Sequence, residues 1–214
     1  MQLPNNAATN GWYNVLPDPT PARQVSGTIR APYVVLGAGV TGLSAARQLA
    51  THLPDEQIVL IEAERVGFGT SGRNSGFALD SFFQGDEPLN NPELSAAHAR
   101  LCTGGLNILR NLVKENEIEC GWHDWGKLHV SAGAEGDASL NGLVQGYETL
   151  GIQAQELNAE EVAVVTGSTF YTAGLKVEAT GLMNPAAMCR GLGETLPSNV
   201  TLYENTPVHR LERG

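Results

Sequence analysis

The sequence predicts an α/β fold in which a Rossmann-like dinucleotide-binding domain is interrupted by an α+β module. Residues 33–62 read as apolar strand, glycine turn, helix and second apolar strand. The turn has the spacing Gly-x-Gly-x-x-Gly. From residue 119 short strands and short helices alternate, and the chain after residue 184 has the pattern of the first module again.

The glycine turn follows a strand at 33–36 and precedes a helix from 43 to about 52 and a strand at 57–61. Gly37 lets the chain turn sharply, Gly39 lets the backbone approach a pyrophosphate, and Gly42 lets the helix pack close to the strand. The helix dipole and free amides then face the phosphates. Glu62 is spaced to accept ribose hydroxyls, and its charge opposes a 2′-phosphate, so FAD or NAD is favoured over NADP.

A second glycine-rich segment, 67–76, follows Glu62 directly. Its four glycines exclude a regular element, and Arg73 and Asn74 lie among them. A flexible surface loop is the alternative, but the position after the acidic strand end favours a loop that contacts the ligand.

The remaining elements follow from capping residues and apolar periodicity. Residues 1–30, rich in Pro, Asn and Thr, read as an arm lying on the surface or partly disordered. We expect helices at 91–116, 138–150, from 158 and at 184–196, and strands at 119–122, 127–131, 153–157, 170–177, 200–204 and 208–211.

Composition narrows the class of protein. The chain has 214 residues, a net charge of −10 and no basic block, which argues against nucleic acid or anionic membrane as partner. It has no apolar run long enough to span a membrane. Three cysteines without CxxC spacing indicate reduced thiols and a cytoplasmic location.

Two local clusters have a structural interpretation. His123 and His129, with Asp124, could suggest a metal site, but no additional ligand has a suitable spacing, so no metal site is expected. The aromatic cluster 122–125 favours buried indoles at a strand edge over a substrate pocket.

The segments 37–46 and 62–76 resemble the FAD-dependent amine and amino-acid oxidoreductases, such as D-amino-acid oxidase, glycine oxidase and sarcosine oxidase. The similarity is greatest to γ-glutamylputrescine oxidase-like enzymes. It implies FAD as cofactor, a noncovalent one, because relatives with covalent flavin carry His near the position of Asn74. The cofactor-binding residues that it implies are Gly37, Ala38, Gly39, Val40, Thr41, Gly42, Glu62, Ala63, Arg65, Thr70, Ser71, Gly72, Arg73, Asn74 and Val208.

The resemblance also implies a domain order. After the arm at 1–30, residues 31–118 would form the first segment of the FAD-binding domain, 119–182 part of a substrate-binding domain, and 183–214 a return to the first. Family members are usually much longer, so a fragment, or one half of a split enzyme completed by a second chain, is expected.

The implied reaction is oxidation of an amine or amino acid to an imine, with hydride passing from the carbon beside the nitrogen to flavin. No catalytic residue is identified. Two alternatives stay open: an NAD-dependent dehydrogenase, and a noncatalytic dinucleotide-fold module for binding or assembly. The glycine-rich loop after Glu62 suits a long, extended cofactor better than NAD.

Overall fold

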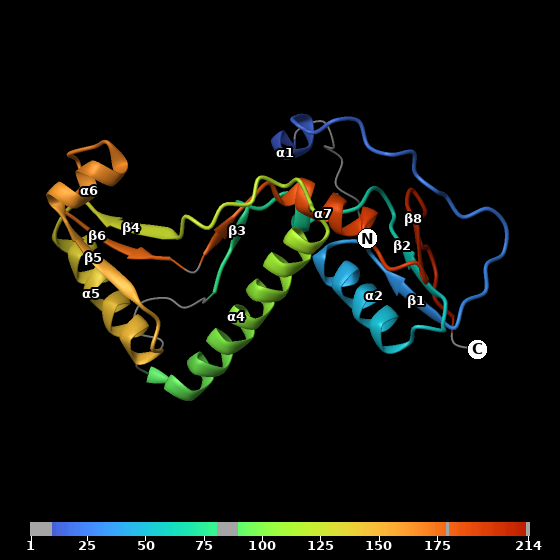
Figure 1. Ribbon diagram of the computed structural model, residues 1–214, viewed down its shortest axis with the longest axis horizontal. Coiled ribbons are helices and arrows are strands. Elements are labelled where there is room, and N and C mark those ends of the chain that lie inside the picture. Colours follow the sequence, from blue (N-terminus) through green and yellow to red (C-terminus); the bar gives the residue numbers. More distant parts are fainter. Residues whose placement is uncertain (1–9, 81–89, 179, 213–214) are drawn as a thin grey trace. The chain divides into compact units, whose positions relative to one another are not determined.

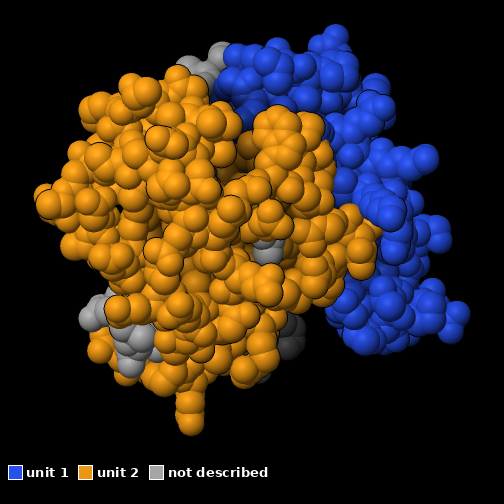
Figure 2. All heavy atoms as spheres, turned by 60° about the vertical axis from the view of Figure 1, so that its left-hand side comes forward, with its two compact units in different colours: residues 1–76, 112–121, 183–214 blue, residues 77–111, 122–182 orange. Residues whose placement is uncertain are grey.

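A computed structural model of the chain describes residues 10–80, 90–178 and 180–212 and divides into two compact units (Figure 2). Unit 1 comprises Met1–Gly76, Leu112–Gly121 and Met183–Gly214. Unit 2 comprises Phe77–Asn111 and Trp122–Leu182. The domain bounds expected from the sequence stay a prediction, and residues 1–9 of the expected arm lie outside the description.

A parallel sheet with the order β1-β2-β8 forms the centre of unit 1 (Figure 1). Its strands are β1 (Tyr33–Leu36), β2 (Ile58–Ile61) and β8 (Val200–Tyr203). Helix α2 (Val40–His52) connects β1 to β2 and packs on the sheet through its buried Leu43, Ala46 and Ala50. The predicted βαβ unit is therefore present, and β8 adds the returning strand.

The central strand β2 and the edge strand β1 of this sheet differ in burial. The first three residues of β2 are at most 2% exposed. In β1, Tyr33, Val34 and Leu36 are 37%, 52% and 45% exposed, and β2 is the only described strand that pairs with β1. Strands of parallel sheets are normally buried on both faces. β1 is thus an apolar edge strand with one side uncovered among the described residues.

Helix α7 (Pro185–Glu194) completes unit 1. The side-chain oxygen of Asn184 accepts hydrogen bonds from the first amides of α7, and Pro185 opens the helix. Most of the α7 side chains are buried. The helix packs against α2, the short helix α1 (Gly11–Asn14) of the N-terminal arm and the 3-10 turn η2 (Thr70–Gly72).

Unit 2 contains an antiparallel sheet with the order β4-β6-β5. Its strands are β4 (Lys127–Ser131), β6 (Ala173–Val177) and β5 (Ala154–Asn158), and helices α5 (Ala134–Thr149) and α6 (Ala159–Thr166) pack on it. Two further strands, β3 (Phe77–Ala78) and β7 (Gly181–Leu182), form a short antiparallel pair. Helix α4 (Pro92–Glu115) begins in unit 2, and its last turn belongs to unit 1.

Several expected elements differ from the observed ones, and α5 begins at Ala134 rather than 138 and β6 at Ala173 rather than 170. α2 begins at Val40 rather than 43, because Gly39 serves as its N-cap. The loop 67–76 contains the 3-10 turn η2. Residues 119–122 form no strand, since Gly121 has a positive φ of 63° and the described pairing there is one bridge from His123 to Leu182. Residues 208–211 form no strand either, and Val208 is 44% exposed.

Candidate cofactor site

The turn from β1 into α2 depends on two glycines. Gly37 has a φ of +94°, which disfavours other residues, and its N–H donates to the Ile61 carbonyl over 2.7 Å. A Cβ on Gly42 would lie 1.8 Å from the Gly37 carbonyl oxygen. The first turn of the helix therefore approaches the strand end more closely than any side chain at 42 allows.

The N-cap residue of α2 is a glycine, so it supplies no side-chain cap to the amides that follow it. Gly39, the N-cap, provides no side-chain hydrogen bond, and the N–H of Val40 donates to Ser71 Oγ over 3.0 Å. Thr41 is the second residue of this helix. A Cβ on Gly39 would lie 2.8 Å from Ser71 Oγ. A helix N-terminus with a glycine in front of it can accept a phosphate at hydrogen-bond distance.

The Glu62 carboxylate braces the same turn. One carboxylate oxygen accepts from the Ala38 N–H over 2.7 Å, and the other accepts from the Glu64 N–H over 3.0 Å. Each oxygen retains acceptor capacity, since an ionised carboxylate offers about four lone-pair sites. The half-buried carboxylate can therefore hold the turn and also accept hydroxyl donors of a ribose.

The glycine-rich loop is attached to the turn by its backbone. The Gly67 N–H donates to the Ala38 carbonyl, and the Gly72 N–H donates to the Gly67 carbonyl, both over 2.9 Å. A Cβ on Gly72 would lie 2.4 Å from the Gly67 oxygen. The loop is thus a tightly folded segment whose Ser71 faces the first amide of α2.

Two polar side chains predicted to line the ligand fold the loop itself. Arg73 Nε donates to the Phe68 carbonyl over 2.7 Å, and the guanidinium lies 4.8 Å from the centre of the Phe68 ring. Asn74 donates to the Ser71 carbonyl over 2.8 Å and accepts from the Gly76 N–H over 2.8 Å. Both side chains therefore stabilise the loop conformation.

The structure does not bring every predicted residue to the turn. Arg65 forms an ion pair with Glu204 at 3.2 Å and donates a hydrogen bond to the Thr20 carbonyl over 2.8 Å. Val208 lies in an exposed segment after β8. Ala63 is half-buried beside Glu62, and the Thr70 carbonyl accepts the Arg73 N–H. The roles assigned to these residues stay predictions.

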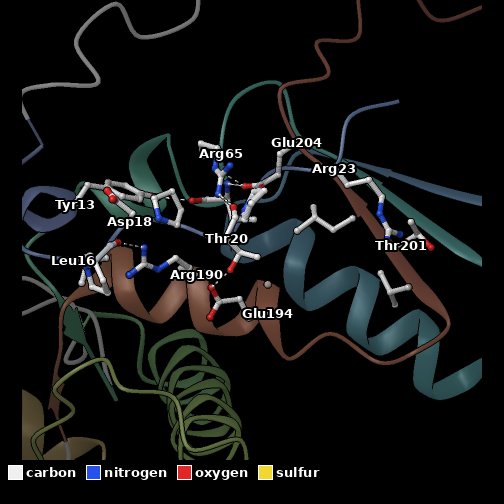
Figure 3. Close-up of a pocket in the computed structure, with 17 residues that line it drawn as sticks. Tyr13, Leu16, Asp18, Thr20, Arg23, Arg65, Arg190, Glu194, Thr201 and Glu204 are labelled. Carbon is white, nitrogen blue, oxygen red and sulfur yellow. Dashed lines mark hydrogen bonds and ion pairs between the residues drawn. The ribbon is translucent and has the colours of Figure 1, made fainter. Parts of the chain in front are cut away.

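A cavity of about 720 Å³ lies beneath the N-terminal arm in unit 1 (Figure 3). None of residues 37–42 lines it, so it is distinct from the turn between β1 and α2. Both Arg190 and Arg65 in its lining already have partners: Arg190 donates to the Pro17 carbonyl over 2.8 Å, and Arg65 contacts Glu204 and Thr20. The cavity is lined by Tyr13, Leu16, Pro17, Asp18, Pro19, Thr20, Pro21, Arg23, Arg65, Val66, Arg190, Gly193, Glu194, Val200, Thr201, Leu202 and Glu204.

The aromatic cluster in unit 2 is a surface feature. Asp124 accepts from Trp122 Nε1 over 2.9 Å and from Arg110 over 3.0 Å. Burial alone would raise the pKa of Asp124, but these two hydrogen-bond donors lower it. Trp125 is 73% exposed and stacks on His123 at 4.8 Å between ring centres. The expectation of buried indoles is wrong for Trp125.

The described residues contain neither a cluster of metal ligands nor a helix that could span a membrane. Within residues 10–80, 90–178 and 180–212, no group of three or more His, Cys, Asp and Glu side chains is placed to hold a metal ion. In the same ranges no helix combines the length and the apolar character needed to cross a bilayer.

With this geometry established, comparison with known proteins identifies the family. Residues 32–214 match the family described as FAD dependent oxidoreductase. The chain belongs to that family. The resemblance seen in the sequence and the FAD expected as family cofactor are thereby confirmed.

Individual relatives agree with this assignment. The chain is 29% identical over 187 residues to a probable oxidoreductase OrdL of Haemophilus influenzae, covering 83% of this chain and 42% of that protein. It is 27% identical over 190 residues to gamma-glutamylputrescine oxidoreductase of Escherichia coli, covering 86% and 44%. The chain thus spans less than half the length of these two relatives.

Solved structures confirm the fold. Glycine oxidase from Geobacillus kaustophilus superposes with a TM-score of 0.66 at 19% identity, covering 83% of this chain and 47% of that one. L-Amino acid deaminase from Proteus myxofaciens superposes with a TM-score of 0.67 at 18% identity, covering 87% and 40%. At this identity the likeness concerns architecture, and the α/β Rossmann-like class is confirmed by it.

Sequence reasoning missed two contributors to the site region. Glu204 is 9% exposed, accepts the Val66 N–H over 2.8 Å and pairs with Arg65. Like Glu62, it directly follows a parallel strand, and that position could have identified it. The other contributor is the arm residues 10–13, for which the sequence carries no periodic signal.

Proposed function

We propose that this chain forms the FAD-binding part of an oxidoreductase that oxidises a C–N bond of an amine or amino acid to an imine. The observation that carries the proposal is the turn from β1 into α2, with the Glu62 carboxylate behind it. It is supported by the names of the relatives, which include gamma-glutamylputrescine oxidoreductase and glycine oxidase.

The residues present fit the diphosphate of FAD. Because Gly39 has no Cβ, the space beside Ser71 stays open. This space adjoins the N-terminus of α2, where the first helix amides lie. A pyrophosphate placed here would accept from these amides and from the Ser71 hydroxyl. Glu62 would accept the adenosine ribose hydroxyls, as the spacing predicted.

Bound FAD would supply the two-electron acceptor for the reaction. The residues of this chain bind and orient: the turn holds the diphosphate, Glu62 holds the sugar, and the loop 67–76 lies beside both. Noncovalent attachment is part of the proposal. Asn74 is an amide engaged in the turn of its own loop, and it offers no nucleophile to a flavin.

We further propose that a second polypeptide segment, corresponding to the part of the relatives that this chain does not match, pairs with β1. The edge position of β1 supports this, because its outer backbone groups have no strand partner among the described residues, and Val34 and Leu36 are exposed beside them. The segment that covers β1 would also provide the remainder of the substrate pocket.

Titration of the purified chain with FAD tests the cofactor part. We expect protein-bound flavin absorption in the wild type, and FAD binding weaker by about tenfold or more in Gly39→Ala, whose methyl group occupies the phosphate space. The apo protein should fold normally, since the Ser71 hydroxyl can rotate away. Gly105→Ala on α4 is the matched control, because a Cβ there meets nothing within 4 Å. Equal FAD affinity in both variants contradicts the proposed site.

Reduction of the bound flavin tests the substrate class. With the second segment supplied, anaerobic addition of an amine or amino-acid substrate should bleach the visible flavin bands. L-2-Hydroxyglutarate dehydrogenase of Escherichia coli is also a relative, at 24% identity over 153 residues. If only 2-hydroxy acids bleach the flavin, the proposed oxidation of a C–N bond is wrong and the reaction is oxidation of a C–O bond.

A further inference from the structure

The N-terminal arm lies outside the residues that match the family, which begin at residue 32. Its first described residues nevertheless contact the glycine-rich loop. Asn10 is only 5% exposed, and α1 packs against α7. This packing needs an explanation, because short polar termini are usually poorly ordered unless something holds them.

Three side chains of the arm donate to main-chain carbonyls of the loop region. Asn10 Nδ2 donates to the Gly72 carbonyl over 2.9 Å, in a buried hydrogen bond. Trp12 Nε1 donates to the Asn74 carbonyl over 2.9 Å. The Tyr13 hydroxyl donates to the Val66 carbonyl. The acceptors lie before, within and near the end of the loop, so the three contacts fix its backbone path independently of its side chains.

Tyr13 also fills space that two loop glycines leave open. A Cβ on Gly67 would lie 3.0 Å from the Tyr13 hydroxyl, and a Cβ on Gly72 would lie 3.2 Å from the Tyr13 ring. Burial, followed by the nearby Cys189, raises the pKa of Tyr13 well above its usual value. The phenol therefore stays a proton donor to Val66 at every physiological pH.

The arm is anchored in turn to the helix behind the loop. Asn184, the N-cap of α7, donates to the Trp12 carbonyl over 3.2 Å while its side-chain oxygen caps α7. Farther along, Arg190 of α7 donates to the Pro17 carbonyl, as Figure 3 shows. The arm thus connects a rigid helix to the loop.

One route from these contacts to the cofactor turn passes through Ser71. The Gly72 carbonyl, which accepts from Asn10, follows Ser71 in the chain. The Ser71 hydroxyl oxygen accepts a hydrogen bond from the first amide of α2. A loop with glycines at 67, 69, 72 and 76 has many accessible backbone states. A ligand that binds only one of these states has an apparent affinity equal to its intrinsic affinity multiplied by the fraction of molecules in that state.

We propose that Asn10, Trp12 and Tyr13 are positioning residues that hold the loop 67–76 in the conformation that binds the cofactor. The inference rests on the proposed FAD function for its ligand. The ordering of the loop itself is independent of that function.

The test uses the full 214-residue chain and the donor-removing variants Trp12→Phe and Tyr13→Phe, which keep an aromatic ring. Tyr171→Phe is the matched control, because Tyr171 lies in unit 2 and its ring packs edge-on against Phe170. Two quantities are measured: hydrogen exchange of loop amides relative to β2 amides in the apo protein, and the FAD dissociation constant.

In each arm variant we expect faster exchange in the loop with unchanged exchange in β2. FAD binding should weaken about fivefold to tenfold, the ratio that the loss of one ordinary hydrogen bond gives. Unchanged loop exchange and unchanged FAD affinity overturn the proposal, as does faster exchange throughout unit 1, which would indicate a purely structural role. If the wild type binds no FAD, the proposed function fails, and loop exchange alone then decides whether the arm positions the loop.

Discussion

Replacing Gly42 by alanine would force the first turn of α2 away from the end of β1. The added Cβ would lie 1.8 Å from the Gly37 carbonyl oxygen and 3.0 Å from the Gly37 carbonyl carbon. Both obstacles are backbone atoms, so no side-chain rotation relieves the contact. Either the helix or the turn has to move.

The size of the effect follows from the distance. An ordinary carbon–oxygen contact is about 3.3 Å or longer, so the two elements must separate by about 1.5 Å. Overpacking of this kind costs about 3 kcal/mol when the backbone must shift. For a chain of this size that corresponds to a Tm lower by about 6–12 °C. The displaced amides should also weaken FAD binding by more than about tenfold.

Thermal unfolding followed by circular dichroism measures the first quantity, and FAD titration the second. Gly105→Ala is the control and should raise the Tm rather than lower it. Its Cβ meets open space in the middle of α4, and alanine favours a helix over glycine by about 0.5–1 kcal/mol. A Gly42→Ala protein as stable as the wild type would refute the packing argument. The close approach of helix and strand would then be unnecessary.

Three other changes have expected outcomes. Glu62→Gln leaves one oxygen to serve the amides of both Ala38 and Glu64, so FAD binding should weaken about tenfold or more in a titration, whereas Glu64→Gln should bind normally. Asn158→Ala removes the capping box of α6 and should lower the free energy of unfolding by about 1 kcal/mol in urea. Burial, followed by Lys127, lowers the pKa of His129 below its ordinary 6.5. The unfolded chain therefore binds the proton more tightly, and the urea midpoint should fall as pH drops below 6.5, with a smaller fall in His129→Phe.

Local patterns sufficed for the nucleotide-binding unit. β1 occupies the residues expected, and β2 begins one residue later, because alternating glycine and apolar runs encode a βαβ unit within a short stretch. The capping box at Asn158 and the Asn184–Pro185 helix start were also visible, since capping depends on neighbours in sequence.

Long-range contacts explain what the sequence did not reveal. Asn10 and Gly72 are 62 residues apart, and no periodicity relates them. The resemblance implies a ligand-binding role for Arg65, which stays a prediction, but it gave no sign that the Arg65 guanidinium pairs with Glu204, which follows a strand more than a hundred residues away. The strand expected at 208–211 had the right residue types, and no described strand pairs with it. Strand propensity acts only when a neighbour is present.

The uncovered flank of β1 has a consequence for handling the protein. Tyr33–Leu36 carries neither a lysine nor an internal proline, the residues that usually keep a bare strand from joining another. Copies of the isolated chain should therefore associate strand to strand as concentration rises, and precipitation on overexpression is the expected behaviour. If the second segment proposed above pairs with β1, producing it together with this chain should keep the chain dispersed in solution.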